Sequence, residues 1–208
     1  MTVKLLIDYY EADHMPDEMN LLYRHGHFCH TFSKVQFNRF FKLGRRRELA
    51  KGEVIMRAGQ PQTKLYYTER GECTAMANRR EVGNILSHRF VGEISFLQYL
   101  KNSKPGAGVS PCDSRARASA TVIAKKGGVI WEWDHEDLTR LLLEEMDISN
   151  AFQSYCAFDL GMKLMAVNDQ KTGLSTYLQA KVTTVAKNVG NKNEREEGER
   201  DQADKVGN

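Results

Sequence analysis

The pattern of hydrophobic and polar positions changes character twice along the chain. Between residues 16 and 41, large apolar side chains recur at roughly helical spacing, with Asp17 as a candidate cap of the first turn. Gly26 and a candidate N-cap at Ser33 interrupt this stretch. The first block is therefore predicted to form two helices.

Short apolar runs alternate with glycines between residues 47 and 133. The runs lie at residues 54–56, 65–67, 73–76, 82–86, 120–123 and 129–131, and the glycines between them are Gly52, Gly59, Gly71, Gly127 and Gly128. Many short strands at intervals of roughly 8–12 residues, separated by turn signals, are typical of a β-barrel or a jelly-roll sandwich. The middle block is therefore predicted to be a small antiparallel roll whose glycines mark turns.

Helical spacing returns after Trp133. Asp134 is a candidate N-cap with Asp137 at the fourth position, and a longer amphipathic run extends from residue 147 to residue 167. Helix, roll and helix together predict an α+β fold, in which an antiparallel β-roll of the jelly-roll type is flanked by N-terminal and C-terminal helices.

One stretch inside the predicted roll does not have the pattern of a strand. In residues 91–100, the pair Gly92-Glu93 precedes apolar positions that suit one or two helical turns. Residues 102–114 are rich in Pro, Gly and Ser and predict a long exposed loop. Arg117 then stands just before the next apolar run.

Composition narrows the class of protein without identifying it. The chain of 208 residues is 41% hydrophobic and 27% charged, which is ordinary globular usage, and its formal charge of +3 is too small to indicate nucleic-acid binding. No apolar run approaches the roughly 20 residues that span a bilayer, and the apolar residues 5–7 are followed at once by acidic ones, unlike a signal peptide. We expect a cytoplasmic location, with peripheral membrane association only through a partner.

The two ends of the chain are expected to lie outside the folded domain. Residues 187–208 contain few apolar side chains and cannot offset the entropy of ordering, so they are predicted to form a disordered charged tail. The predicted division is an N-terminal extension at 1–16, the main domain at 17–169, a C-terminal helix or linker at 170–186 and the tail at 187–208.

The start of the short helix in the roll carries the most informative chemistry. A helix N-terminus offers backbone N–H groups and a partial positive charge to a phosphate. The Arg117 guanidinium can hold two phosphate oxygens, and the Glu93 carboxylate can accept a hydrogen bond from a sugar hydroxyl. A phosphate and a ribose hydroxyl held inside an apolar roll describe a cyclic nucleotide. A turn glycine, a first-turn glutamate and solvated arginines would give the same pattern without a site.

Several motifs add to this interpretation. They are Lys51-Gly52-Glu53-Val54-Ile55 with Gly59, Leu65-Tyr66-Tyr67 with Gly71-Glu72, the segment Phe90–Leu97 and the segment Arg117–Val122. With them, the chain from about Phe37 to Asp169 resembles the cyclic nucleotide-binding domain family, whose phosphate-binding cassette begins and ends like the last two segments. Within that superfamily it is most similar to the Popeye domain, through residues 120–124, 136–138 and 158–164, Trp133 and Asn168-Asp169.

The resemblance implies a set of ligand-binding residues. The set is Gly92, Glu93, Ile94, Arg117, Ser119 and Thr121. Glu93 would bind the ribose 2′-hydroxyl and Arg117 the cyclic phosphate, assisted by the backbone amides on either side of Glu93. The family's arginine stands three residues before the threonine, a position that is Ala118 in this chain, so Arg117 lies one residue early. Phe152, Tyr155 and Phe158 fit core packing better than base stacking, but the closing helices of the family cover the base, so one of the three is a candidate lid.

The predicted function is regulatory. The module would bind cyclic AMP or cyclic GMP, change the packing of its closing helices between residues 134 and 167, and so alter its affinity for an unidentified protein partner. The alternative is a degenerate roll that acts as an interaction scaffold without nucleotide. The chain shows no nucleophile elbow, P-loop, HExxH motif or kinase glycine loop, so no enzymatic activity is predicted, and no cofactor besides the nucleotide ligand.

Histidines and cysteines give weaker signals. Residues 25–30 hold three histidines and Cys29, which invites a zinc site, but no second Cys or His cluster follows at a suitable spacing, and a helix junction is favoured. A metal-dependent roll enzyme is disfavoured because His88 is the only histidine among the predicted strands. The four cysteines form no CxxC pair and are expected to be buried or free thiols.

Basic clusters are the last open signal. They lie at Arg45-Arg46-Arg47, Arg79-Arg80 and Lys125-Lys126. Such clusters most often mark solvated turns. A patch for an acidic partner or an anionic membrane surface is the alternative interpretation.

Overall fold

The structure, a computed structural model of the chain, describes residues 15–103 and 117–166. The predictions made for residues 1–14, 104–116 and 167–208 lie outside the described residues. They concern most of the N-terminal extension, most of the long loop, the segment that follows the main domain and the charged tail.

Two helices and a short 3-10 turn precede the roll, as the hydrophobic pattern predicts. They are α2 (Asp17–His25), η1 (Phe28–His30) and α3 (Lys34–Leu43). α2 ends at Gly26, and α3 begins at Ser33, whose hydroxyl accepts a hydrogen bond from the Gln36 backbone N–H at 3.3 Å. The Gln36 side chain accepts one in return from the Ser33 N–H at 2.8 Å, so a capping box fixes where α3 starts.

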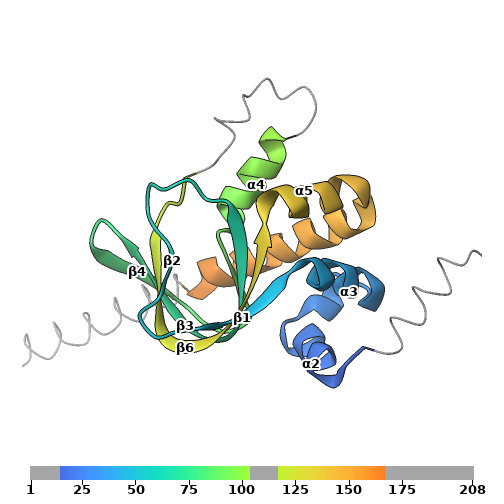
Figure 1. Cartoon of the computed structure of the whole chain (residues 1–208), viewed down its shortest axis with the longest axis horizontal. Coiled ribbons are helices and arrows are strands. Elements are labelled where there is room, and N and C mark those ends of the chain that lie inside the picture. The colour runs from blue at the N-terminus through green and yellow to red at the C-terminus, as the bar shows by residue number, and fades with distance from the viewer. Residues whose placement is uncertain (1–14, 104–116, 167–208) are drawn as a thin grey trace, which may run out of the picture. The chain divides into compact units, whose positions relative to one another are not determined.

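In the described part of the chain, six strands form the roll, and their pairings are antiparallel. The strands are β1 (Arg45–Leu49), β2 (Val54–Met56), β3 (Lys64–Ala77), β4 (Arg80–Ile85), β5 (Arg89–Val91) and β6 (Thr121–Asp134). The order β1-β6-β3-β4, with β2 beside β6 and β5 beside β3, makes the long strands β3 and β6 the centre of the roll (Figure 1). The predicted α+β class, an antiparallel roll with flanking helices, is confirmed.

Three glycines predicted to mark turns lie inside strands instead. β3 continues through Gly71, and β6 continues through Gly127 and Gly128, so each long strand joins two predicted short ones. A Cβ on Gly128 would lie 2.0 Å from the Arg70 carbonyl oxygen, at a point where the β3–β6 register shifts. The glycine is required there by the close approach of two backbones, not by a turn.

Two short strands have no counterpart among the predictions. Residues 45–47, interpreted from the sequence as a solvated turn, belong to β1 and pair with residues 130–132 of β6. Charged side chains are common on edge strands, where they discourage pairing with other chains, and they hide the strand pattern. β5 pairs with residues 66–68 of β3 and leads directly into α4 (Glu93–Asn102), which is longer than the one or two turns predicted.

α5 (His135–Glu144) and a last helix at residues 146–166 close the fold, as predicted. Asp134 occupies the N-cap position of α5, but its side chain makes no capping hydrogen bond. Residues up to Leu160 belong to the same compact unit as the roll.

Two clusters of buried apolar side chains stabilise the fold. The first joins the helices to the strands and is called the aromatic cluster; its largest members include Phe28, Phe37, Phe40, Phe41, Tyr67, Phe90, Phe96, Trp131, Trp133, Phe152 and Tyr155. The second lies among the strands and is called the roll cluster; it consists of Leu49, Ile55, Met56, Tyr66, Cys73, Val91, Ala118, Val122, Ala124 and Ile130. Side chains alternate between the faces of a strand, so Leu65 and Tyr67 enter the first cluster while Tyr66 enters the second.

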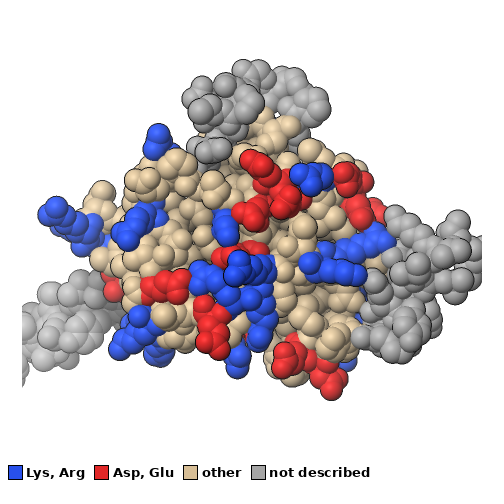
Figure 2. Space-filling view, in the orientation of Figure 1, with Lys and Arg blue, Asp and Glu red and all other residues tan. Residues whose placement is uncertain are grey.

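Charged side chains on the surface of the roll pair with one another. Arg46 donates two hydrogen bonds to Glu69, and Lys125 and Lys126 each lie 3.0 Å from Glu72. Figure 2 shows Lys and Arg side chains interspersed with Asp and Glu on the face in view. These basic clusters are therefore partly neutralised, which favours solvated ion pairs over an open basic patch.

Among the described helices, none is both long enough and apolar enough to cross a membrane.

Candidate functional site

Gly92 and Glu93 lie where strand β5 gives way to α4. Gly92 is the N-cap residue, and its φ of 87° is a left-handed conformation that glycine adopts without strain. A Cβ there would lie 3.5 Å from the Lys64 carbonyl oxygen and 3.7 Å from Met56 Sδ, so the turn sits close to the roll. Glu93 is only 5% exposed, whereas the Ile94 side chain is 61% exposed. The structure therefore buries the predicted ribose acid in the first helical turn, where backbone amides favour negative charge.

The other half of the predicted site runs beside the connection between β2 and β3. The Arg117 side chain is exposed, and its Nη1 donates a hydrogen bond to the Gly59 carbonyl oxygen at 2.7 Å. Ser119 is exposed as well. Thr121 begins β6, and its Oγ1 accepts a hydrogen bond from the Ala58 backbone N–H at 3.0 Å. In this arrangement the two polar side chains of Arg117 and Thr121 hold the β2–β3 connection in place.

Ala118, next to Arg117, faces the inside of the roll. Its side chain is 4% exposed and belongs to the roll cluster, and its backbone exchanges hydrogen bonds with Gly59 and Gln60 at 2.8 and 3.0 Å. Successive residues of an extended chain point to opposite sides, so a shift of one residue turns a side chain from the inside to the outside. Position 118, where the resemblance places the family's arginine, thus points inward but carries a methyl group, while the side chain of Arg117 is exposed.

The start of α4 and the inward position 118 lie around the same buried region. Val91, which precedes Gly92, and Ala118 are both members of the roll cluster. Gln62, on the connection that Arg117 holds, has its Cγ 3.9 Å from the place that a Gly92 Cβ would take. The structure therefore brings the two predicted halves to one region of the roll, while the binding roles of their residues stay predictions.

A buried acid on the last helix reaches the strand that leads into α4. Asp159 is fully buried; its Oδ2 accepts a hydrogen bond from the Phe90 backbone N–H at 3.3 Å, and its Oδ1 lies 3.6 Å from Arg89 Nε. The closing helix is thereby tied to β5, just before Gly92. Sequence reasoning did not single out Asp159 as a functional contact, because nothing in the local pattern distinguishes one buried acid from the solvated acids of an amphipathic helix.

The three candidate lid residues differ in exposure. Phe152 and Tyr155 are fully buried members of the aromatic cluster. Phe158 is partly exposed, and its ring centroid lies 5.8 Å from that of His27. Of the three, Phe158 alone keeps an exposed ring surface that a base could contact.

The thiols and histidines that the structure describes show no sign of a metal centre. Cys29 is exposed and Cys73 and Cys156 are buried, all three as free thiols, whereas Cys112 lies outside the described residues. Burial raises the pKa of the Cys73 thiol to about 11, so it stays protonated at neutral pH. Across residues 15–103 and 117–166, no three His, Cys, Asp or Glu side chains come together in a way that could hold a metal ion.

Comparison with known proteins places this fold in a family. The model of the cyclic nucleotide-binding domain family matches residues 46–145. Together with the antiparallel roll and its flanking helices, this match shows that the chain contains a cyclic nucleotide-binding domain. A search of curated proteins found no match to the chain.

Solved structures share the fold at low sequence identity. A cyclic nucleotide-binding domain from Methylobacillus flagellatus is 14% identical, with a TM-score of 0.55 over 67% of this chain and 72% of that one. A protein described as cyclic nucleotide-binding from Geobacter metallireducens is 13% identical, with a TM-score of 0.54 over 72% of this chain and 99% of that one. PKAR CBD2 bound to Sp-2Cl-cAMPS is 13% identical, with a TM-score of 0.50 over 79% of this chain and 94% of that one. At these identities the likeness shows the fold alone.

Proposed function

We propose that the domain binds a cyclic nucleotide, either cyclic AMP or cyclic GMP, and acts as a regulatory module. The observation that carries the proposal is the buried Glu93 carboxylate at the N-terminus of α4, beside the roll cluster. An acid in this place suits a ribose hydroxyl, and the first-turn amides suit a phosphate. The same fold in PKAR CBD2 holds Sp-2Cl-cAMPS, which supports a nucleotide ligand for this chain.

In this proposal the cyclic phosphate rests mainly on backbone amides at the start of α4, those of Gly92 and Ile94. Arg117 contacts the phosphate only after its guanidinium leaves the Gly59 carbonyl oxygen, and Ser119 and Thr121 lie on the same segment. A guanidinium at the inward position 118 is missing, and a charge-assisted contact of this kind contributes about 1.5–3 kcal/mol. We therefore expect saturable but weak binding.

The effect of ligand binding would be transmitted to the closing helices through their contact with β5. Asp159 connects the last helix to Arg89 and Phe90, so movement of the Gly92 turn changes the surroundings of that helix. Exposed Leu143 and Met146, where α5 meets the last helix, would then offer apolar surface to a protein partner. Any membrane association would come through that partner, and the finer relation to the Popeye domain stays a prediction.

Titration of the purified chain with fluorescent cyclic AMP and cyclic GMP tests the proposal. Glu93→Gln removes a charged acceptor and should weaken binding about tenfold or more. Glu81→Gln, at an exposed glutamate of β4, is the matched control and should leave the affinity unchanged. Ala118→Arg supplies an inward guanidinium and should strengthen binding about tenfold or more. The proposal fails if neither the wild type nor a folded Ala118→Arg variant binds nucleotide saturably.

The second candidate function is an interaction scaffold without nucleotide, acting through its surface or its tail. One observation favours it: Arg117 faces outward and binds Gly59, while Ala118 fills the inward position. For a scaffold, Arg117→Ala would loosen the β2–β3 connection and lower thermal stability, and added nucleotide would not raise the melting temperature of any variant.

A further inference from the structure

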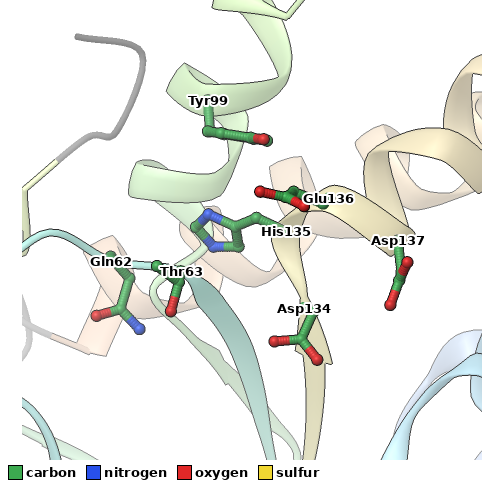
Figure 3. Close-up of a pocket in the computed structure, with 7 residues that line it drawn as sticks. All are labelled: Gln62, Thr63, Tyr99, Asp134, His135, Glu136 and Asp137. Carbon is green, nitrogen blue, oxygen red and sulfur yellow. The ribbon is translucent and has the colours of Figure 1, made fainter. Parts of the chain in front are cut away.

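A cavity of about 260 Å³ opens between α4 and the start of α5 (Figure 3). Its walls are Gln62 and Thr63 before β3, Tyr99 of α4, and residues 134–137, where β6 passes into α5. Neither Glu93 nor Arg117 lines it, so it is separate from the residues proposed to hold the nucleotide.

A buried histidine without a hydrogen-bond partner lines this cavity. His135 is 3% exposed, and neither of its ring nitrogens makes a hydrogen bond of good geometry among the described residues, although the Lys64 backbone lies close enough to affect its pKa. The ring packs near Phe96 and Tyr99, with centroid separations of 5.0 and 5.2 Å. Figure 3 shows it between Tyr99 on one side and Thr63 on the other. A buried polar group without a partner is costly, so these nitrogens suit a ligand that hydrogen-bonds to them.

Three acidic side chains at the junction of β6 and α5 are among the residues that line the cavity. Asp134, Glu136 and Asp137 are all exposed, and Figure 2 shows acidic residues gathered above the start of α5. Asp134 is not used to cap the helix, and Asp137 has a 3.5 Å contact with Arg140. Burial lowers the pKa of His135 to about 4, against a smaller opposite effect of the Lys64 backbone, so the imidazole is neutral at pH 7. The acidic rim therefore faces a cavity whose histidine adds no positive charge.

We propose that this cavity binds a small organic cation, an alkyl guanidinium or ammonium group, between the acidic rim and the His135 ring. The N–H groups of such a cation fit the carboxylates and the acceptor nitrogen of a neutral imidazole. The Tyr99 ring adds a surface on which a cation is favoured. The volume lies just below the roughly 300–1,000 Å³ of pockets for drug-sized ligands, which suits a small group.

The site would link the two helices that border it. Gln62 lines the cavity and also lies next to Gly92 at the start of α4. A bound cation would contact α4 through Tyr99 and α5 through His135. The proposal does not depend on nucleotide binding, because no wall residue belongs to the set proposed for the nucleotide.

Calorimetric titration of the full chain with two probes tests the proposal. Agmatine is a free alkyl guanidinium, and N-acetyl-arginine amide carries the same group on a peptide backbone. We expect saturable binding of at least one probe, together with a shift of the His135 ring signals in NMR spectra. Binding of agmatine alone indicates a free small molecule as the natural source, and binding of the arginine derivative indicates a protein side chain.

Variants on the rim give the sharper comparison. Asp134→Asn combined with Glu136→Gln should weaken binding about tenfold or more, because two charged acceptors are lost. Glu144→Gln, at the far end of α5, is the matched control and should bind like the wild type. Glu93→Gln should also leave agmatine binding unchanged, which separates this test from that of the nucleotide.

The proposal is overturned if neither probe binds saturably at millimolar concentration and the His135 signals do not move. It is equally overturned if the rim variants bind as tightly as the wild type. His135→Phe keeps a ring in the wall and should abolish binding. If that variant does not fold, the rim variants still decide the question, because their side chains are exposed.

Discussion

The aromatic cluster and the roll cluster differ in the size of the side chains that they bury. In the aromatic cluster, Phe28 stacks on Tyr155 with ring centroids 4.2 Å apart and meets Phe41 edge-on at 5.2 Å. The roll cluster is aliphatic apart from Tyr66 and the sulfur-containing Met56 and Cys73, and it includes two alanines. Large rings bury more apolar area, so the helix–strand junction should supply more stability than the roll interior. The candidate nucleotide site lies beside the roll cluster, where a substitution should reduce the free energy of unfolding by less.

The largest effect is expected from truncating a ring of the aromatic cluster. Phe28→Ala should lower the free energy of unfolding by about 3–5 kcal/mol, because the fully buried ring contacts several others. Val122→Ala, at a buried position of the roll cluster, should cost about 2 kcal/mol or less, because only two methyl groups are lost. Urea unfolding measures both. Equal losses would contradict the division of roles between the clusters.

The next effect is a pH dependence at the edge of the aromatic cluster, where His135 packs on Phe96. Burial lowers the pKa of His135 from 6.5 to about 4, so the unfolded chain takes up this proton first as the pH falls. The folded state is therefore expected to lose about 3 kcal/mol of stability between pH 6.5 and pH 4, and none of it above that range. His135→Phe has no such proton to bind, so its free energy of unfolding should fall by about 3 kcal/mol less than that of the wild type over this pH range. Urea unfolding at a series of pH values measures both. An equal fall in the two proteins would refute the explanation.

A smaller effect is expected where the last helix meets β5. Asp159→Asn keeps the shape of the side chain but removes the charge facing Arg89, and should cost about 1–3 kcal/mol. Asp147→Asn, at an exposed position on the same helix, is the control and should change little. Urea unfolding of both variants gives the comparison. Similar values for the two would show that the contact with β5 does not hold the helix.

The sequence predicted the layout of the fold because layout depends on periodic patterns. Alternation and helical spacing indicate which blocks are strands and which are helices, and the capping box at Ser33 marks a helix start directly. The same method misplaced the turns at Gly71 and Gly127–Gly128, since a glycine signals equally a turn or a close contact between backbones. The strand at residues 45–47 was missed because its charges hide the alternation.

In the candidate site, too, features with a local sequence signature could be predicted, and features that depend on tertiary packing could not. The buried start of α4 could be predicted, because a helix after Gly92 inside a roll has a local signature. That position 118 faces inward follows from alternation once the strand is known. Asp159 and His135 could not be predicted, because their burial depends on which distant elements pack against them.

The smallest effect is expected on the surface of the roll, where charges meet instead of apolar side chains. Glu69 accepts hydrogen bonds from Arg46 at 2.7 and 2.8 Å and from Trp131 Nε1 at 2.8 Å. The Arg46 side chain is 40% exposed, so water and salt screen the pair, and Arg46→Ala should cost at most about 1 kcal/mol. Arg46→Lys keeps the charge without the planar guanidinium, so its stability should lie between that of the wild type and that of Arg46→Ala. Because Trp131 belongs to the aromatic cluster, a loss as large as that of Val122→Ala and insensitive to salt would show that the pair supports the packing of that cluster.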